Sequence, residues 1–185
     1  MIDEIYDIFD RAGTHIGTAT WTDCHTKGLI HKTVACLIFK DASKQEVLLQ
    51  RRSMRMAQQP GKLQHSAGGH VLAGMSMDEG MRQELQEELF LDRSLPAIKI
   101  KEVTVSFQND LPNNYEFITI YEIIYPGPFF FNPKEVAEEP VLIKWFDLLN
   151  DIKNSPEKFA PSFLHIMKAY IKAVESKMYD KTCLV

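Results

Sequence analysis

The sequence of 185 residues predicts an α+β fold in which helices cover a mixed β-sheet as an α/β/α sandwich. The first observation is the apolar run at residues 33–40, TVACLIFK, which is typical of a buried strand. The second is residues 46–52, EVLLQRR, which follow a polar turn and suit an antiparallel partner. The third is that strand and helix patterns then intermix along the chain with short connections.

The segments around these two strands are shorter. Residues 5–9 and 15–21 predict an N-terminal hairpin that turns at residues 11–13. Residues 53–62 contain Pro60-Gly61 and predict a loop. Residues 63–72 then predict short strands that Gly68-Gly69 interrupts.

A helix is predicted to begin near Met77. Ser76 and Glu79 have the spacing of a capping box, in which each side chain bonds the backbone N–H of the other. Met81, Leu85 and Leu89 recur every four residues and form the stripe expected to face the core.

The second half of the chain predicts further strands and a final helix. Residues 98–107 and 115–124 are strand candidates joined by a turn at residues 110–114, and residues 141–146 form another candidate. Residues 148–153 predict a helical turn. A helix starting near residue 155 has an apolar stripe formed by Phe163, Met167, Tyr170 and Val174. We expect one domain over residues 1–185, with a hairpin extension at 1–30 and a C-terminal helix at 155–178.

Composition limits the class of protein. The net charge of -4 argues against a protein that binds nucleic-acid polymers through a basic field. Cys24, Cys36 and Cys183 are odd in number and widely spaced, which favours reduced thiols in the cytoplasm. The N-terminus lacks the pattern of a signal peptide, and no apolar run approaches the ~18–20 residues of a membrane span. We therefore expect a cytoplasmic protein that does not associate with membranes.

The predicted helix carries three acidic residues on one face. Glu84, Glu87 and Glu88 stand at positions i, i+3 and i+4, which share a face of an α-helix. Three neighbouring carboxylates repel one another unless a cation lies among them. Mg²⁺ or Mn²⁺, which take oxygen ligands, are the expected ions. Gly69 precedes this helix by a short loop, so the segment predicts a loop-helix-loop metal site.

This segment resembles the Nudix box, the motif of the Nudix hydrolase superfamily. With its first glycine on Gly69, the motif matches Gly69, Glu84, Leu85, Glu87, Glu88 and Leu91. Three positions depart from it: Met75 replaces a glutamate, Gln83 an arginine and Phe90 a glycine. The resemblance implies a Nudix-type fold and a metal-dependent enzyme.

The resemblance extends beyond the box to the branch that includes isopentenyl-diphosphate isomerase. Its residues are DIFDR at 7–11, Gly17, His25, Gly28 and His31, then LLQRRS at 48–53, PGK at 60–62 and SAGGHV at 66–71. It runs from about residue 3 to about residue 150, and it implies a small-molecule diphosphate substrate. Relatives in this superfamily are often homodimers, so it also implies a homodimer.

The resemblance assigns roles to individual residues. Glu84, Glu87 and Glu88 would hold the metal, and one of them would also accept a proton from the attacking water. The backbone carbonyl of Gly69 would be a further metal ligand. A fourth acid comes from a later strand or loop, and Glu116 is our candidate, with Glu138 or Glu139 behind it. The alternative for Glu116 is a solvent-facing strand residue.

Four basic residues precede the box. Arg51, Arg52, Arg55 and Lys62 lie at the strand end and loop where they would contact phosphate oxygens of the substrate. We predict that this group includes a substrate contact, while a solvated loop residue is the favoured interpretation for any single member.

Three histidines are scattered before and after the first core strand. In the isomerase branch, histidines in places comparable to His25, His31 and His70 bind a second metal. Their wide spacing favours structural hydrogen bonding, and we take this as the expectation. Phe107, Tyr115 and Phe117 suit stacking on a base, although strand aromatics usually belong to a core.

The departures from the box should affect how precisely Glu84 is held more than they affect the fold. Met75 and Gln83 replace an acid and a base together, which leaves no buried charge without its partner. Glycine after a helix commonly adopts a left-handed conformation, so Phe90 requires another helix end or carries strain. We expect the fold to survive and the hydrolytic activity to be weakened.

Three functions are compatible with these features. The first is a divalent-metal-dependent hydrolase of a nucleoside diphosphate derivative or another organic diphosphate. The second is an isopentenyl-diphosphate isomerase, but the cysteine that usually precedes the equivalent of Gly69-His70 is missing from residues 64–71. The third is a non-catalytic module that binds a diphosphate on the same scaffold.

Overall fold

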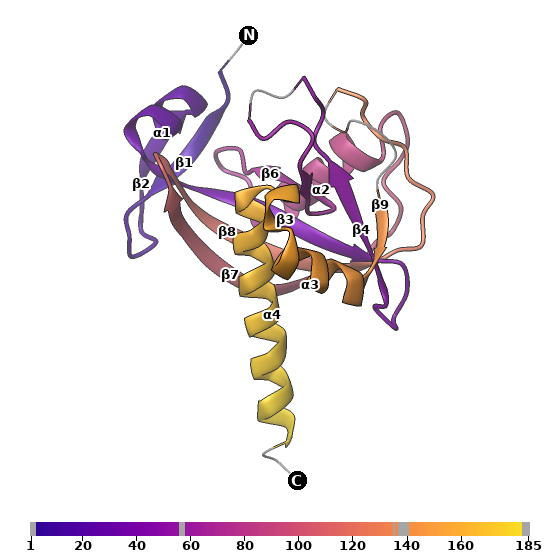
Figure 1. Cartoon of the computed structure of the whole chain (residues 1–185). Helices are drawn as coiled ribbons and strands as arrows, with labels where there is room; N and C mark the ends of the chain where they lie inside the picture. The colour runs from indigo at the N-terminus through magenta and orange to yellow at the C-terminus, as the bar shows by residue number, and fades with distance from the viewer. Residues whose placement is uncertain (1–2, 56–57, 135, 137–140, 183–185) are drawn as a thin grey trace.

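The computed structural model describes residues 3–55, 58–134, 136 and 141–182. Its strands are β1 (Ile5–Phe9), β2 (His15–Thr20), β3 (Ile30–Phe39), β4 (Glu46–Arg51), β5 (Leu63–Gln64), β6 (Ala67–His70), β7 (Ile100–Leu111), β8 (Asn114–Ile124) and β9 (Val141–Lys144). Its helices are α1 (Trp21–Lys27), α2 (Met77–Leu89), α3 (Trp145–Asn154), the short 3₁₀ helix η1 (Pro156–Lys158) and α4 (Pro161–Thr182) (Figure 1).

Strand β3 is the centre of a mixed sheet. It pairs antiparallel with β1, β4 and β6, and parallel with β8. Strand β7 then extends the sheet beside β8, and β9 extends it beside β4. The mixed sheet and the antiparallel pairing of β3 with β4 confirm the prediction. The parallel β3–β8 pair brings distant parts of the chain together at the site described below.

The two faces of β3 explain the layers of the fold. Val34, Cys36 and Ile38 belong to a cluster of buried residues that includes the apolar stripe of α2. Alternate residues of the same strand belong to a second cluster, which contains residues of α3 and α4. Side chains alternate between the faces of a strand, so one apolar run serves both layers. The predicted sandwich is thus confirmed.

Helix α2 begins and packs as the sequence predicts. Both hydrogen bonds of the Ser76–Glu79 capping box are present, and Met81, Leu85 and Leu89 are buried. The helix ends without a left-handed residue at Phe90, whose φ is -132°. Asp92 adopts positive φ instead, at 57°. The Phe90 side chain is buried beside Tyr125 and Phe129, so this departure from the box adds to the core.

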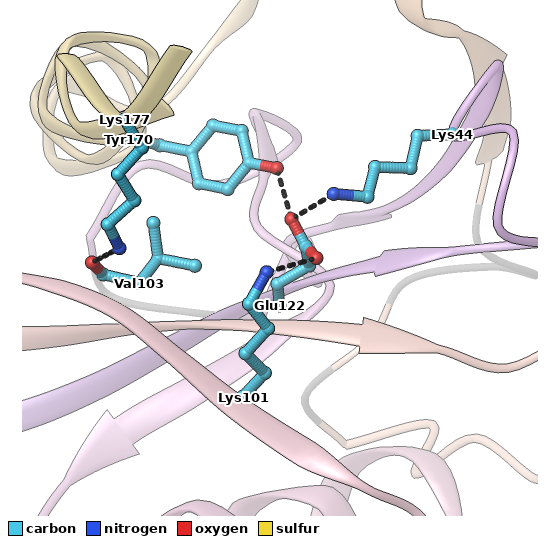
Figure 2. Close-up of polar contacts among 6 residues, drawn as sticks. All are labelled: Lys44, Lys101, Val103, Glu122, Tyr170 and Lys177. Carbon is cyan, nitrogen blue, oxygen red and sulfur yellow. Dashed lines mark hydrogen bonds and ion pairs between the residues drawn. The ribbon is translucent and has the colours of Figure 1, made fainter. Parts of the chain in front are cut away.

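A polar cluster around the buried Glu122 fastens α4 to the sheet (Figure 2). The Tyr170 hydroxyl donates a hydrogen bond of 2.7 Å to Glu122 of β8, and Lys44 Nζ lies 2.7 Å from the same carboxylate oxygen. Lys101 lies 3.4 Å from the other oxygen. Lys177 donates to the backbone carbonyl of Val103 at 2.8 Å. These contacts fix the direction of α4, whose C-terminal end projects beyond the sheet (Figure 1).

Several predicted boundaries were wrong. Gly68 and Gly69 lie inside β6, and the interruption between β5 and β6 falls at His65-Ser66. Strand β9 ends at Lys144, because Trp145 already begins α3. The final long helix begins at Pro161, after the short helix η1 near the predicted start at residue 155. Helix α1 was not predicted at all.

Two features bear on the predicted class of protein. Cys24 and Cys36 are free thiols, both buried, while Cys183 lies outside the described residues. Among the described residues, none of the helices combines the length and the apolar character that crossing a bilayer requires.

Candidate active site

A cavity of about 470 Å³ lies against α2, β6 and the N-terminal elements. Its wall contains most of the residues that the sequence assigns to the site: Arg52, Gly69, Glu84, Glu87, Glu88 and Glu116. These residues come from four separate segments of the chain. The sheet therefore gathers the predicted groups around one space.

Three histidines gather around a glutamate, and His25, His70 and Glu116 of this group line the cavity. His25, His31, His70 and Glu116 each place one ligand atom within 4.8 Å of the others. His31 Nε2 and His70 Nε2 each lie 3.7 Å from the Glu116 carboxylate. The parallel register of β3 and β8 sets His31 opposite Glu116, and the β3–β6 register sets His70 opposite Thr33. The three rings therefore converge, although the residues are widely spaced in the sequence.

Backbone hydrogen bonds orient two of these rings. His25 Nδ1 lies 2.9 Å from the Trp21 carbonyl, and His31 Nδ1 lies 2.9 Å from the Leu29 carbonyl. A carbonyl oxygen only accepts, so each Nδ1 carries the proton and each Nε2 of the neutral ring keeps a lone pair. Metal-binding histidines are commonly oriented by such bonds to a carbonyl.

Burial favours the neutral form of His25 and His70, which is the form that binds a metal. It lowers the pKa of His70 to about 4 and also lowers that of His25. Burial alone would raise the pKa of Glu116, but His31 and His70 beside it lower that pKa by more. The Nε2 atoms of His31 and His70 are buried and make no hydrogen bond with any described residue. Neutral imidazoles with one carboxylate are a donor set that fits a divalent transition metal.

Glu116 is buried, with 7 % of its surface exposed, so the alternative of a solvent-facing strand residue was wrong. It lies beside the three histidines and lines the same cavity as the acids of α2, so its part in the metal site stays a prediction. Glu138 and Glu139, the other candidates for a further acid, lie outside the described residues.

The three glutamates of α2 have different surroundings. Glu88 is buried, and its carboxylate accepts hydrogen bonds from the Gly68 N–H at 3.0 Å and from Gln50 Nε2 at 2.9 Å. Glu87 is exposed and accepts a hydrogen bond of 2.8 Å from Gln83. Glu84 is partly buried. Gln83, which replaces the arginine of the box, thus supports one of the three acids.

Gly69 lets Glu84 approach the sheet. A Cβ atom at Gly69 would lie 2.6 Å from Cδ of Glu84 and closer still to one of its oxygens. Any other residue here would displace the carboxylate from its position against β6. The glycine of the box is therefore required by a close approach between the strand and the helix.

The basic residues separate into one that lines the cavity and three that do not. Arg52 lines it and donates to Gln64 Oε1 at 2.8 Å and to the Gln58 carbonyl at 3.0 Å. Arg51 donates to the Gly61 carbonyl, and Lys62 donates to the Glu157 carbonyl. The described residues that line the cavity do not include Arg51, Arg55 or Lys62.

The wall also contains residues that the sequence did not single out. Trp21 lines the cavity and stacks on His25, with ring centroids 4.2 Å apart. His65 lines it as a buried side chain. A lone histidine or tryptophan has no periodic signal, so no pattern reveals its position. Phe107 and Phe117 instead pack on each other at 5.0 Å and are not part of the described cavity wall.

Comparisons with known proteins agree with this architecture. A sequence profile of the NUDIX domain matches residues 29–162. The chain is 30% identical to the isopentenyl-diphosphate Delta-isomerase of Serratia proteamaculans over 170 residues, which covers 90% of this chain and 91% of that one. It is 36% identical over 93 residues to an uncharacterized Nudix hydrolase of Clostridium acetobutylicum, covering 50% and 45% of the two chains.

A solved structure shares the fold. A crystal structure of a Deinococcus radiodurans protein superposes with a TM-score of 0.68 at 22% identity, covering 82% of this chain and 90% of that one. The profile match spans most of the chain and includes the strand, loop and helix that form the cavity wall. The chain therefore belongs to the NUDIX domain family, and it is an enzyme of the Nudix hydrolase type.

Proposed function

We propose that the protein hydrolyses an organic diphosphate, such as a nucleoside diphosphate derivative, with the help of Mg²⁺ or Mn²⁺. One observation carries this proposal. Glu84, Glu87 and Glu88 line the same cavity as His25, His70 and Glu116, and His31 is buried beside these three. A diphosphate in this cavity would meet acidic metal-binding groups from α2 and a second donor set from the sheet.

Different residues of the chain would bind the metal, contact the phosphate and accept the proton. When bound, divalent cations neutralise phosphoryl oxygens and lower the pKa of an attacking water. Glu84, Glu87 and Glu88 would hold cations through oxygen ligands, which Mg²⁺ and Mn²⁺ prefer. The imidazole-rich cluster favours a transition metal over Mg²⁺. Arg52 would contact a phosphate oxygen, and one of the glutamates would accept the proton of the water.

Isomerisation of isopentenyl diphosphate is the second candidate, because isomerases are among the relatives that cover most of the chain. The isomerase cysteine would precede Gly69-His70, where this chain has Gly68. A Cβ atom there would lie 2.8 Å from the Ala35 Cα and closer to the Val34 carbonyl oxygen. The backbone therefore leaves no room for a cysteine, which favours hydrolysis.

The two other described cysteines do not replace it. Cys24 and Cys36 are buried and are not part of the described cavity wall. Burial also raises the pKa of both thiols, which disfavours the reactive thiolate.

A panel of diphosphates tests the proposal. Purified protein with Mg²⁺ or Mn²⁺ should release products from ADP-ribose or another nucleoside diphosphate derivative, and chelation should abolish this. A Glu84→Gln variant should bind the same compound with little turnover. If wild-type protein binds diphosphates and cleaves none of them, the non-catalytic module replaces the hydrolase.

A further inference from the structure

His65 is a buried histidine at the cavity with no hydrogen-bond partner among the described residues. It lies between β5 and β6 with 8 % of its surface exposed, and it lines the cavity. Neither Nδ1 nor Nε2 makes a hydrogen bond with any described residue. Burying polar atoms without partners is unfavourable, so a side chain left in this state needs an explanation.

The ring is neutral and therefore offers two kinds of hydrogen bond. Burial and the charge of Arg52 lower the pKa of His65 to about 4. In a neutral imidazole one nitrogen donates and the other accepts. The nitrogen that accepts needs a donor as its partner. A hydroxyl can donate to it, whereas the oxygens of an ionised phosphate only accept.

The neighbours of His65 are also polar. Gln64, which precedes it, is buried, lines the cavity and accepts the 2.8 Å hydrogen bond from Arg52. Ser162, at the start of α4, lines the same cavity. We call Gln64, His65 and Ser162 the polar wall. It adjoins the start of β6, whereas His70 and the histidine–glutamate cluster lie at the end of that strand.

The position of the ring is fixed by the strand beside it. A Cβ atom at Gly68 would lie 2.9 Å from His65 Nε2, so the ring lies against the bare backbone of β6. The Ser66 hydroxyl behind it donates to the Leu48 carbonyl at 2.5 Å and accepts from the Ile38 N–H at 2.8 Å. The segment is thus held rigidly by hydrogen bonds of Ser66 that do not involve the imidazole.

We propose that His65 contacts the substrate, and that the polar wall selects organic diphosphates whose organic group carries hydroxyls over those with a hydrocarbon chain. This inference rests on the proposed function, because it places the diphosphate at the metal-binding end of the cavity. The organic group then extends along β6 to His65. A hydrocarbon chain would leave the ring nitrogens of His65 without a partner, and sites built to hydrogen-bond a hydroxyl reject analogues that lack it.

The test replaces His65 by leucine, which has a similar size and no polar atoms. Calorimetry would measure the affinity, with Mn²⁺ present, for the methylene-bridged analogues of ADP-ribose and isopentenyl diphosphate, which resist hydrolysis. His15→Leu is the matched control, because His15 is exposed and is not part of the described cavity wall. His65→Gln keeps a donor and an acceptor and guards against a failure of the first variant to fold.

His65→Leu should weaken binding of the ADP-ribose analogue about 10-fold or more and leave the isopentenyl analogue within about twofold. Without ligand it should unfold at the same temperature as the wild type or higher, because it removes buried polar atoms without partners. His65→Gln should retain part of the affinity. His15→Leu should change neither value.

Two results would overturn the inference. Equal loss of both ligands would show that the wall does not select hydroxyls. A lower unfolding temperature with unchanged selectivity would show that His65 is a structural residue, held by buried water. If the wild type binds the analogue selectively but does not cleave ADP-ribose, the hydrolase fails while the role of His65 stands.

Discussion

The Nε2 atom of His31 lies 3.7 Å from the carboxylate of Glu116, although the two residues belong to strands far apart in the sequence. The parallel register of β3 and β8 sets them directly opposite each other. His25 and His70 complete the group from α1 and β6. These four side chains therefore connect α1 to strands β3, β6 and β8.

Removing a histidine of this cluster should weaken metal binding. His70→Ala removes one converging nitrogen from a partly exposed position, so the fold should be retained. We expect the affinity for Mn²⁺ to fall by about 10–100-fold in isothermal titration calorimetry. His15→Ala, at an exposed histidine, is the control. Equal Mn²⁺ affinities in wild type and His70→Ala would contradict the assignment.

Substitutions of Glu87 and Glu88 should separate an effect on activity from an effect on stability. Glu88→Ala leaves the Gly68 N–H without its acceptor, so unfolding should become easier by about 1–3 kcal/mol. Glu87→Ala changes an exposed residue, so its stability should stay within about 0.5 kcal/mol of wild type. Both variants should lose hydrolysis. Urea unfolding beside an activity assay checks this, and a fully active Glu87→Ala protein would remove Glu87 from the site.

Adjacent glycines should respond differently to one added methyl group. In Gly68→Ala the new Cβ meets the backbone of β3, so we expect a loss of at least about 1–3 kcal/mol. In Gly69→Ala it meets the end of the Glu84 side chain, which can move. That variant should keep most of its stability and lose activity. Thermal unfolding and turnover of both proteins provide the comparison, and a stable, active Gly68→Ala protein would contradict it.

The hydrogen bond between Tyr170 and Glu122 should stabilise the docking of α4. Tyr170→Phe removes a buried donor to a carboxylate and should cost about 1.5–3 kcal/mol in urea unfolding. Tyr125→Phe is the matched control, because its hydroxyl makes only a 3.4 Å contact with the Pro128 carbonyl. Similar losses in the two variants would show that the Glu122 cluster contributes little.

The pH dependence of the free energy of unfolding should reflect the protonation of His65. Its pKa is lowered from 6.5 to about 4 in the folded protein, so below about 6.5 the unfolded chain binds a proton that the folded protein does not. The free energy of unfolding should therefore fall as the pH decreases from about 6.5 to about 4.

His65→Leu lacks this contribution. Its stability relative to wild type should increase by about 3 kcal/mol across that interval, in urea titrations with a chelator present. A difference that stays constant with pH would show that His65 is not held neutral.

The elements with a strong local pattern were predictable from the sequence. The apolar run of β3, and the capping box and core stripe of α2, each specify one element through short-range spacing. The close approach of Gly69 to α2 agrees with the box as well. Helix α1 was missed because it has only seven residues, although Thr20 and Asp23 at its start carry a capping signal.

The convergence of the histidines was not predictable in the same way. It depends on a parallel pairing between distant strands, which no local spacing encodes. His65 is harder still, because a single histidine in a short connection gives no periodic signal. What marks it is the absence of hydrogen bonds to its ring among the described residues, a property of the packed structure alone.

The most direct test of the proposed hydrolysis is a product assay in which one protein sample is given two substrates. Wild-type protein with Mg²⁺ or Mn²⁺ would be given ADP-ribose and isopentenyl diphosphate separately, and the products separated by chromatography. We predict AMP and ribose 5-phosphate from the first and no dimethylallyl diphosphate from the second. Dimethylallyl diphosphate formed without any cleavage of ADP-ribose or of other organic diphosphates would contradict the account.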